Sequence, residues 1–173
     1  MRLAYQAHID QKRKDDGSPY FIHPAMVALN LRSHGFADEV VAAGLVHDVL
    51  EDTTVTQDQL EAELGKDVVA IVLGVSEDKS LVWEERKKKY IEDVANSSES
   101  VMAVSVADKI HNLQSLLAAY AVRGEDVWQV FNRGRAQKYW FESTLLARIQ
   151  EKWQHPLVEE YAGLVKQMAE LGT

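Results

Sequence analysis

Four ionisable residues stand close together in the first third of the sequence: His47, Asp48, Glu51 and Asp52. They follow an apolar run that ends at Val46. On a helix, residues four positions apart share a face. His47 would therefore lie beside Glu51, and Asp48 beside Asp52. Carboxylates at the C-terminal end of a buried helix oppose the helix dipole and raise one another's pKa. A divalent cation would relieve that repulsion, and so would exposure of the helix end to water.

Two other segments carry residues of the types that bind metals. Asp108 and Asn112 are four positions apart in the largely apolar segment 104–113. An aspartate in such a setting is rarely buried unless it is paired or bound to a metal. The segment 20–24 places His23 directly before a proline at a predicted helix start. Together these segments offer two histidines and two carboxylates, a set that suits Mn²⁺, Fe²⁺ or similar ions: His23, His47, Asp48 and Asp108.

Composition limits the other kinds of chemistry. The chain has 173 residues and no cysteine, which excludes a disulfide framework, a thiolate zinc site and a cysteine nucleophile. A formal net charge of −8 argues against a protein that binds polymeric nucleic acid, but not against one that binds a small phosphorylated ligand. No apolar run approaches the roughly 18 residues of a membrane span, and no signal peptide is recognisable. We therefore expect a cytosolic protein without membrane contact.

The elements that position these residues are predicted to be helices. The 131 residues between Pro24 and Pro156 contain no proline, and strand signals are weak. We expect an all-α fold, a single compact domain over residues 1–173 with about nine or ten helices. The expected helices cover approximately 1–10, 24–35, 38–50, 57–64, 67–76, 83–95, 99–121, 126–153 and 156–171.

Several local features of these helices can be predicted. Pro24 is expected at a first helical position, and Asp38 is expected to be an N-cap. Thr56 and Gln59 form the pattern of a capping box, and Gly65 is a predicted helix stop. The helix over 38–50 is apolar on all sides, so we expect it to be central. Residues 11–22 are predicted to form a polar loop. Three histidines are expected to be surface or capping groups near helix ends and turns: His8, His34 and His155.

Four ordered segments resemble blocks of a known family: HIDQKRKDDGSPYFIHPAMVA, LVHDVLEDTTVT, LGVSEDKSLVWEERKKKYIE and VADKIHNL. The order of the proposed ligands is that of the HD phosphohydrolase superfamily. The segments resemble the RelA/SpoT hydrolase domain and are most similar to its free-standing small alarmone hydrolase branch, which includes animal SpoT homologues. The resemblance covers residues 7–117, whereas the helices over about 125–171 are less similar.

The resemblance implies an all-helical HD-domain bundle that hydrolyses the 3′-pyrophosphate of ppGpp and pppGpp, giving GDP or GTP and pyrophosphate, with Mn²⁺ as the metal. The positions of the metal ligands match His23, His47, Asp48 and Asp108. Glu51 and Asp52 match a Glu-Asp pair that would orient the attacking water and take its proton, and which of the two is the base stays open.

The resemblance also implies substrate-binding residues. Arg13 would stack its guanidinium on a purine, Lys14 would supply a charge for phosphates, and Asn112 would contact the nucleotide. Lys138 and Tyr139 are candidates for a phosphate or ribose contact, although a solvated helix face is at least as well supported. The basic run 86–89 is expected to be a solvated face because acidic residues surround it.

Two alternatives remain beside this interpretation. An HD-type phosphohydrolase acting on another phosphorylated nucleotide, such as NADPH, would use the same metal ligands. A non-catalytic nucleotide-binding regulator would be expected to lack a ligand or the Glu-Asp pair, and none is lacking. The expected partner is a small nucleotide, and the oligomeric state, a homo-oligomer included, stays open.

Overall fold

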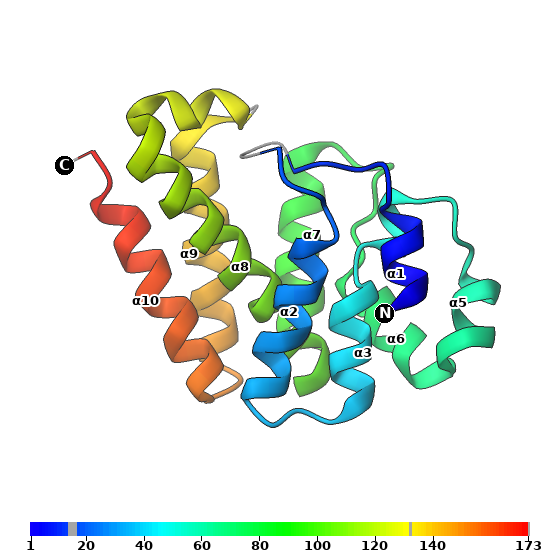
Figure 1. Cartoon of the computed structure of the whole chain (residues 1–173). Helices are drawn as coiled ribbons and strands as arrows, with labels where there is room; N and C mark the ends of the chain where they lie inside the picture. Colours follow the sequence, from blue (N-terminus) through cyan, green and yellow to red (C-terminus); the bar gives the residue numbers. More distant parts are fainter. Residues whose placement is uncertain (14–16, 132, 173) are drawn as a thin grey trace.

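The computed structural model of the protein describes residues 1–13, 17–131 and 133–172 (Figure 1). Within these ranges the regular structure is helical, which confirms the all-α fold class, and a single bridge joins Lys12 to Pro19. None of the described helices combines the length and the apolar content that crossing a membrane requires. The helices are α1 (Arg2–Ala7), α2 (Ile22–Ser33), α3 (Asp38–Val46), α4 (Val49–Asp52), α5 (Gln57–Leu64), α6 (Lys66–Val75), α7 (Trp83–Ala95), α8 (Glu99–Arg123), the 3₁₀ helix η1 (Gly124–Val130), α9 (Gly134–Gln150) and α10 (Pro156–Glu170).

The central element of the fold is α8. Every residue from 101 to 110 is buried, so this part of the helix is enclosed on all sides. It packs against α2, α3, α6 and α10, and Figure 1 shows it between α10 and α2. The segment 38–50, expected to be central, packs against α2, α6 and α8 but is only partly buried. Both segments are apolar all round, and the sequence pattern does not tell which of them the other helices surround.

The segment 38–50 is also not one helix. The helix α3 ends at Val46 and α4 begins at Val49, so His47 and Asp48 lie in the turn between them. Consecutive side chains on a continuous helix point about 100° apart. Both side chains nevertheless reach the same site, as described below.

Two helix starts differ from the prediction, and one predicted helix is split. α2 begins at Ile22, so Pro24 is the third helical residue rather than the first. Ala37, not Asp38, is the N-cap of α3, and Asp38 instead accepts a hydrogen bond from Arg32 at 2.5 Å. The predicted helix over 126–153 consists of η1, which ends at Val130, and α9, which begins at Gly134, where φ is +69°. A residue with a positive φ interrupts an α-helix, and glycine adopts it without strain.

Other local predictions are confirmed. Thr56 and Gln59 form a reciprocal capping box at the start of α5, and Gly65 ends that helix with a φ of +84°. The helix predicted over 83–95 is α7 with the same ends. These features depend on hydrogen bonds between residues a few positions apart, which local sequence determines.

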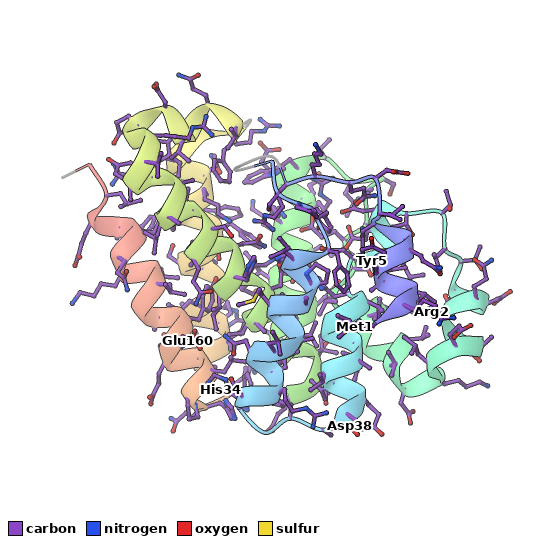
Figure 2. The ribbon with its side chains drawn as sticks, viewed as in Figure 1. Met1, Arg2, Tyr5, His34, Asp38 and Glu160 are labelled. Carbon is purple, nitrogen blue, oxygen red and sulfur yellow. The ribbon has the colours of Figure 1, made fainter. Side chains whose placement is uncertain are left out.

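All three histidines expected near helix ends lie there, and His8 is the C-cap of α1. His155 is the N-cap of α10, where its Nδ1 accepts a hydrogen bond from the Leu157 N–H. His34 is the C-cap of α2, and its Nε2 lies 3.8 Å from Glu160 of α10 (Figure 2). His8 is different, because it is only 1% exposed and packs against the Tyr20 ring. The expectation of a surface His8 is wrong, since the loop after α1 covers it.

Candidate active site

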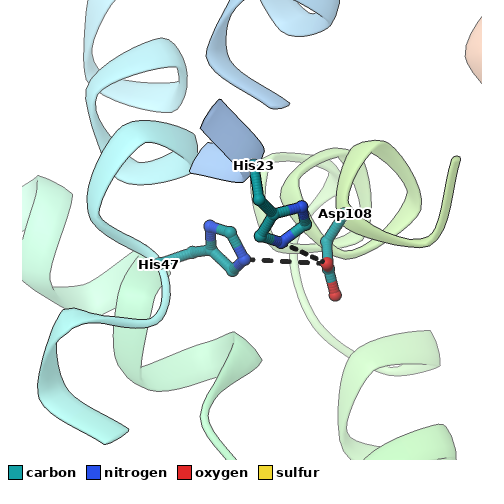
Figure 3. A group of neighbouring side chains, drawn as sticks. All are labelled: His23, His47 and Asp108. Atoms are coloured by element: carbon teal, nitrogen blue, oxygen red, sulfur yellow. Dashed lines mark ion pairs between the residues drawn. The ribbon is translucent and has the colours of Figure 1, made fainter. Parts of the chain in front are cut away.

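His23, His47 and Asp108 come together from α2, the α3–α4 turn and α8 (Figure 3). Each offers one ligand atom, and these atoms all lie within 4.8 Å of one another. The Asp108 Oδ1 atom is 3.0 Å from the His23 Nε2 and 3.7 Å from the His47 Nε2. All three residues are buried. Imidazole nitrogen and carboxylate oxygen are ligands of divalent transition metals, so this group is a candidate site for a divalent metal.

Asp48 borders this group. Its Oδ2 is 3.0 Å from the His47 Nε2 and 3.6 Å from the His23 Nε2. The Tyr20 hydroxyl donates a hydrogen bond of 2.5 Å to the same oxygen. Burial raises the pKa of Asp48, but His47 outweighs this effect and holds the pKa below its usual value. The four residues proposed as metal ligands from the sequence are thus brought into one cluster.

The imidazole of His47 is oriented by its own helix. Its Nδ1 lies 2.8 Å from the carbonyl oxygen of Gly44, and because a carbonyl only accepts, Nδ1 carries a proton. The Nε2 atom is buried, and among the described residues it has no hydrogen-bond partner of acceptable geometry. A ring that donates from one nitrogen and leaves the other without a partner is the usual arrangement of a metal-binding histidine. The residues present therefore fit a metal.

The charges around the two rings also favour a cation. Burial lowers the pKa of His47, but the carboxylates of Asp48 and Asp108 outweigh it and raise the pKa well above its usual value. The same carboxylates would stabilise any cation in front of Nε2. Burial lowers the pKa of His23, which favours the neutral form of that ring. A neutral imidazole is the form that binds metals.

A buried lysine accompanies Asp108. The Lys109 Nζ donates a hydrogen bond of 2.6 Å to the Asp108 Oδ2 and lies 5.0 Å from the centre of the Tyr90 ring. Asn112 donates to the Asp108 Oδ1 at 2.6 Å. Burial lowers the pKa of Lys109, but Asp108 outweighs it and raises the pKa well above its usual value. Sequence reasoning missed Lys109, although an adjacent pair of opposite charges in an apolar segment was a usable signal.

Glu51 and Asp52 face different spaces. Glu51 lines a small cavity of about 90 Å³ beside His47 and Asp48, and its Oε1 accepts the backbone N–H of Glu77 at 3.0 Å. Burial raises the pKa of Glu51. Asp52 lines a larger cavity, which adjoins the small one at Asp48 and Asp108, and accepts a hydrogen bond of 2.7 Å from Lys79. A raised pKa makes the Glu51 carboxylate a stronger proton acceptor than an ordinary glutamate.

The cavity that Asp52 lines, which we call the metal-side cavity, has a volume of about 460 Å³ and is also lined by His23, Asp48 and Asp108. Arg13 and Asn112 also line it and are joined by a hydrogen bond of 3.3 Å from the Arg13 Nη2. Its apolar wall consists of Leu116, Val127, Val130 and Phe131. Two of the predicted substrate residues, Arg13 and Asn112, thus lie together, whereas Lys14 is outside the described residues.

A second cavity of about 520 Å³ adjoins the first, because Asn112, Phe131 and Lys138 line both. Among the described residues its lining includes five cationic side chains and no carboxylate. We call it the cationic cavity. Its cations are Arg86, Lys87, Lys109, Arg133 and Lys138.

The basic run 86–89 contributes to this cavity, which corrects the expectation of a solvated face. The side chains of Arg86 and Lys87 are only 25% and 18% exposed, and both pair with Glu77. Lys88 and Lys89 are exposed, as predicted. Lys138 lines both cavities, whereas Tyr139 is 42% exposed and is not among the described residues that line either one.

Comparisons with known proteins agree with this geometry. The model of the HD domain family matches residues 1–136. A zebrafish protein named guanosine-3′,5′-bis(diphosphate) 3′-pyrophosphohydrolase MESH1 is 40% identical over 119 residues, which cover 67% of this chain and 66% of the relative. The human protein of that name is 41% identical over 117 residues, which cover 66% and 65%. This chain thus matches just under two thirds of the length of these relatives.

Two solved structures are similar along most of the chain. The crystal structure of lmo0812 from Listeria monocytogenes has a TM-score of 0.80 and 39% sequence identity, and the match covers 84% of this chain and 97% of that one. A metazoan ortholog of SpoT, described as hydrolysing ppGpp, has a TM-score of 0.80 and 28% identity, and the match covers 96% and 91%. The arrangement of helices is therefore shared with both proteins.

Proposed function

Because the chain belongs to the HD domain family, we propose that it hydrolyses the 3′-pyrophosphate of ppGpp and pppGpp, giving GDP or GTP and pyrophosphate. One observation supports this function most directly. The buried group of His23, His47 and Asp108, which we call the His-Asp group, contributes two of its residues to the metal-side cavity, and this cavity adjoins the cationic cavity. A nucleotide that carries phosphates at both its 3′ and 5′ positions matches two adjoining sites of this kind. The relatives named for that reaction add to the support.

The proposed metal ligands are His23, His47, Asp48 and Asp108, and we propose Mn²⁺ as the ion because nitrogen and oxygen donors suit it. When bound, such an ion would lower the pKa of a water molecule and polarise a phosphoryl oxygen. The chain itself orients its donors. Gly44 accepts the Nδ1–H of His47, and Tyr20 holds Asp48 in place.

Glu51 is the proposed general base. It takes a proton from the attacking water, whose oxygen forms a bond to the 3′-linked phosphorus. The bond from that phosphorus to the ribose 3′ oxygen breaks, pyrophosphate leaves, and the ribose oxygen takes up a proton. Asp52 and Lys79 are paired at 2.7 Å beside Glu51 and orient the reacting groups. The raised pKa of Glu51 makes it a stronger base than an ordinary glutamate.

The nucleotide is proposed to lie along the metal-side cavity. Arg13 stacks on the purine, Asn112 contacts the nucleotide, and the wall that includes Leu116 and Phe131 covers an apolar face. Lys14 is proposed as a further phosphate-binding residue from its place in the sequence. The 5′-phosphates extend into the cationic cavity. The reaction is proposed to take place in the cytosol.

Product analysis tests the function. The protein is incubated with ppGpp and Mn²⁺, and the nucleotides are separated by anion-exchange chromatography. We expect GDP and pyrophosphate in equal amounts, no reaction with EDTA, and recovery on adding Mn²⁺ back. A parallel reaction contains NADPH. Phosphate release from NADPH without turnover of ppGpp would assign another nucleotide substrate, and binding of ppGpp without any product would favour the non-catalytic regulator.

A further inference from the structure

A buried ion pair lies behind the junction of the two cavities. Glu142 of α9 is 0% exposed, and its Oε1 accepts a hydrogen bond of 2.5 Å from the Lys138 Nζ. Its Oε2 accepts a hydrogen bond of 2.5 Å from the hydroxyl of Tyr161, a buried residue of α10. Both oxygens of the carboxylate are therefore engaged, and Glu142 holds the lysine ammonium at a fixed place.

Stability does not account for this pair. Removing two charges from water costs about as much as their attraction returns, so a buried ion pair is often no better than apolar side chains of the same size. The order along the helix is also unfavourable, because a lysine four residues before a glutamate opposes the helix dipole. A pair that contributes little to folding is explained more readily by what the lysine faces.

Lys138 lines two adjoining cavities. Among the described residues it is the one cationic side chain that lines both the metal-side cavity and the cationic cavity. The ammonium group has three N–H donors, and Glu142 accepts one of them. The side chain keeps 17% of its surface exposed although its partner has none. The remaining N–H groups are available to an anion that occupies both cavities.

We propose that Lys138 binds the 5′-diphosphate of the nucleotide and that Glu142, held by Tyr161, is its positioning residue. The assignment rests on the proposed function, which places the 3′-pyrophosphate at the His-Asp group. The 5′-phosphates of the same molecule then lie across the junction, where Lys138 is the shared cation. Lys138 thereby distinguishes nucleotides that carry 5′-phosphates from those that lack them.

GDP binding tests this proposal without requiring catalysis, since GDP carries its diphosphate at the 5′ position. Calorimetry on the protein without added metal compares wild type, Lys138→Met and Lys88→Met, the last of which removes the same charge from an exposed site on α7. We expect Lys138→Met to weaken GDP binding by roughly tenfold to a hundredfold, as the loss of a hydrogen bond to a charged group predicts. Lys88→Met should change it less than twofold. An equal effect of the two variants would overturn the proposal.

Kinetics with Mn²⁺ compare ppGpp with guanosine 3′-diphosphate, which lacks 5′-phosphates. Lys138→Met should raise the KM for ppGpp by a similar factor, with kcat within about threefold of wild type, and leave the KM for guanosine 3′-diphosphate unchanged. A rise of both KM values by the same factor would show that Lys138 does not act on the 5′-phosphates. If wild type hydrolyses neither compound, the proposed function fails, and the GDP measurement still decides whether Lys138 binds a 5′-diphosphate.

The positioning role is tested with Glu142→Gln and the double variant Lys138→Met/Glu142→Gln. If Glu142 acts through Lys138, the single Gln variant weakens GDP binding several-fold, and the double variant equals Lys138→Met. If the fold losses in GDP affinity of the two single variants instead multiply in the double variant, Glu142 acts independently of Lys138. The double variant leaves no unpaired buried charge. If Lys138→Met alone does not fold, the double variant is therefore compared with wild type in its place.

Discussion

The Nδ1 atoms of His23 and His111 lie 2.8 Å apart, so one ring donates a proton to the other. His111 follows Asp108 by three positions on α8. When the His23 Nδ1 is the donor, its Nε2 carries a lone pair at 3.0 Å from Asp108, inside the candidate metal site. Metal binding at Nε2 requires this tautomer, so we expect the contact with His111 to support metal binding by His23.

His111→Phe should weaken Mn²⁺ binding by roughly tenfold to a hundredfold, because outer partners of metal-binding histidines typically contribute that much. Isothermal titration calorimetry measures the affinity. The control is His34→Gln, which removes a histidine at the α2–α10 contact (Figure 2) and should not change it. Unchanged affinity in His111→Phe would mean that the contact does not support metal binding by His23.

Asp108→Ala should abolish metal binding and also destabilise the fold. The substitution leaves Lys109 buried without its carboxylate partner, which costs about 3–5 kcal/mol of unfolding free energy. Asp108→Ala/Lys109→Met should recover most of that stability but neither metal binding nor activity. Urea denaturation and metal titration separate the two effects. Full ppGpp hydrolysis by either variant would contradict the site assignment.

Glu51→Gln should keep Mn²⁺ binding and lower kcat by about 10²- to 10⁴-fold, the usual contribution of a general base. Asp52→Asn should have a smaller effect, because Asp52 is already paired with Lys79 at 2.7 Å. Single-turnover kinetics with ppGpp compare the variants. A larger loss in Asp52→Asn would reverse the two roles.

The pH dependence of kcat should reflect the protonation of Glu51. Burial raises the pKa of Glu51, so the acid limb of the profile should lie above the usual glutamate range. The Lys79 ammonium, 3.6 Å from the Glu51 Oε2, lowers that pKa. Lys79→Met should therefore move the acid limb to higher pH, because Glu51 then stays protonated up to a higher pH. Lys89→Met, which removes an exposed charge paired with Asp93, is the control; a limb that stays in place in Lys79→Met would argue against Glu51 as the base.

Gly44→Ala should destabilise the protein by about 1–3 kcal/mol, the usual cost of overpacking. A Cβ atom at Gly44 would overlap the Leu31 Cδ1 atom and lie 3.3 Å from the Val27 Cγ1, where α3 crosses α2. The matched control is Gly163→Ala on α10, where nothing lies within 4 Å of a new Cβ. That change should stabilise the protein by about 0.5–1 kcal/mol, because alanine is the better helix former. Thermal unfolding of both variants provides the comparison, and a Gly44→Ala variant as stable as wild type would show that α2 and α3 can move apart.

Features that depend on neighbours in the chain were predictable from the sequence. The capping box at Thr56 and the ends of α7 matched because their hydrogen bonds join residues within one or two turns. The ordered motifs predicted that His23, His47 and Asp108 belong together, and the structure brings them within 4.8 Å. The metal-binding role of these residues remains a prediction.

Features that depend on the packing of distant segments were not predictable in the same way. Tyr20 reaches Asp48 across 28 positions, and Tyr161 reaches Glu142 across 19. His8 is buried because the chain returns over it, although its local sequence is that of a surface turn. Burial and pairing of these groups follow from which helices meet, and no local pattern records that.

The sequence by itself therefore determined the helical class, most helix positions and the residue types of the candidate site. Periodicity and capping depend on residues that are near one another in the chain, and motif order is a property of the sequence. Only the tertiary structure decided that α8 is central, that the helix breaks at His47, and that five cations from three separate segments line one cavity. The physical reason is that burial and electrostatic pairing are properties of surfaces in contact. Those surfaces form only when segments far apart in the sequence pack together.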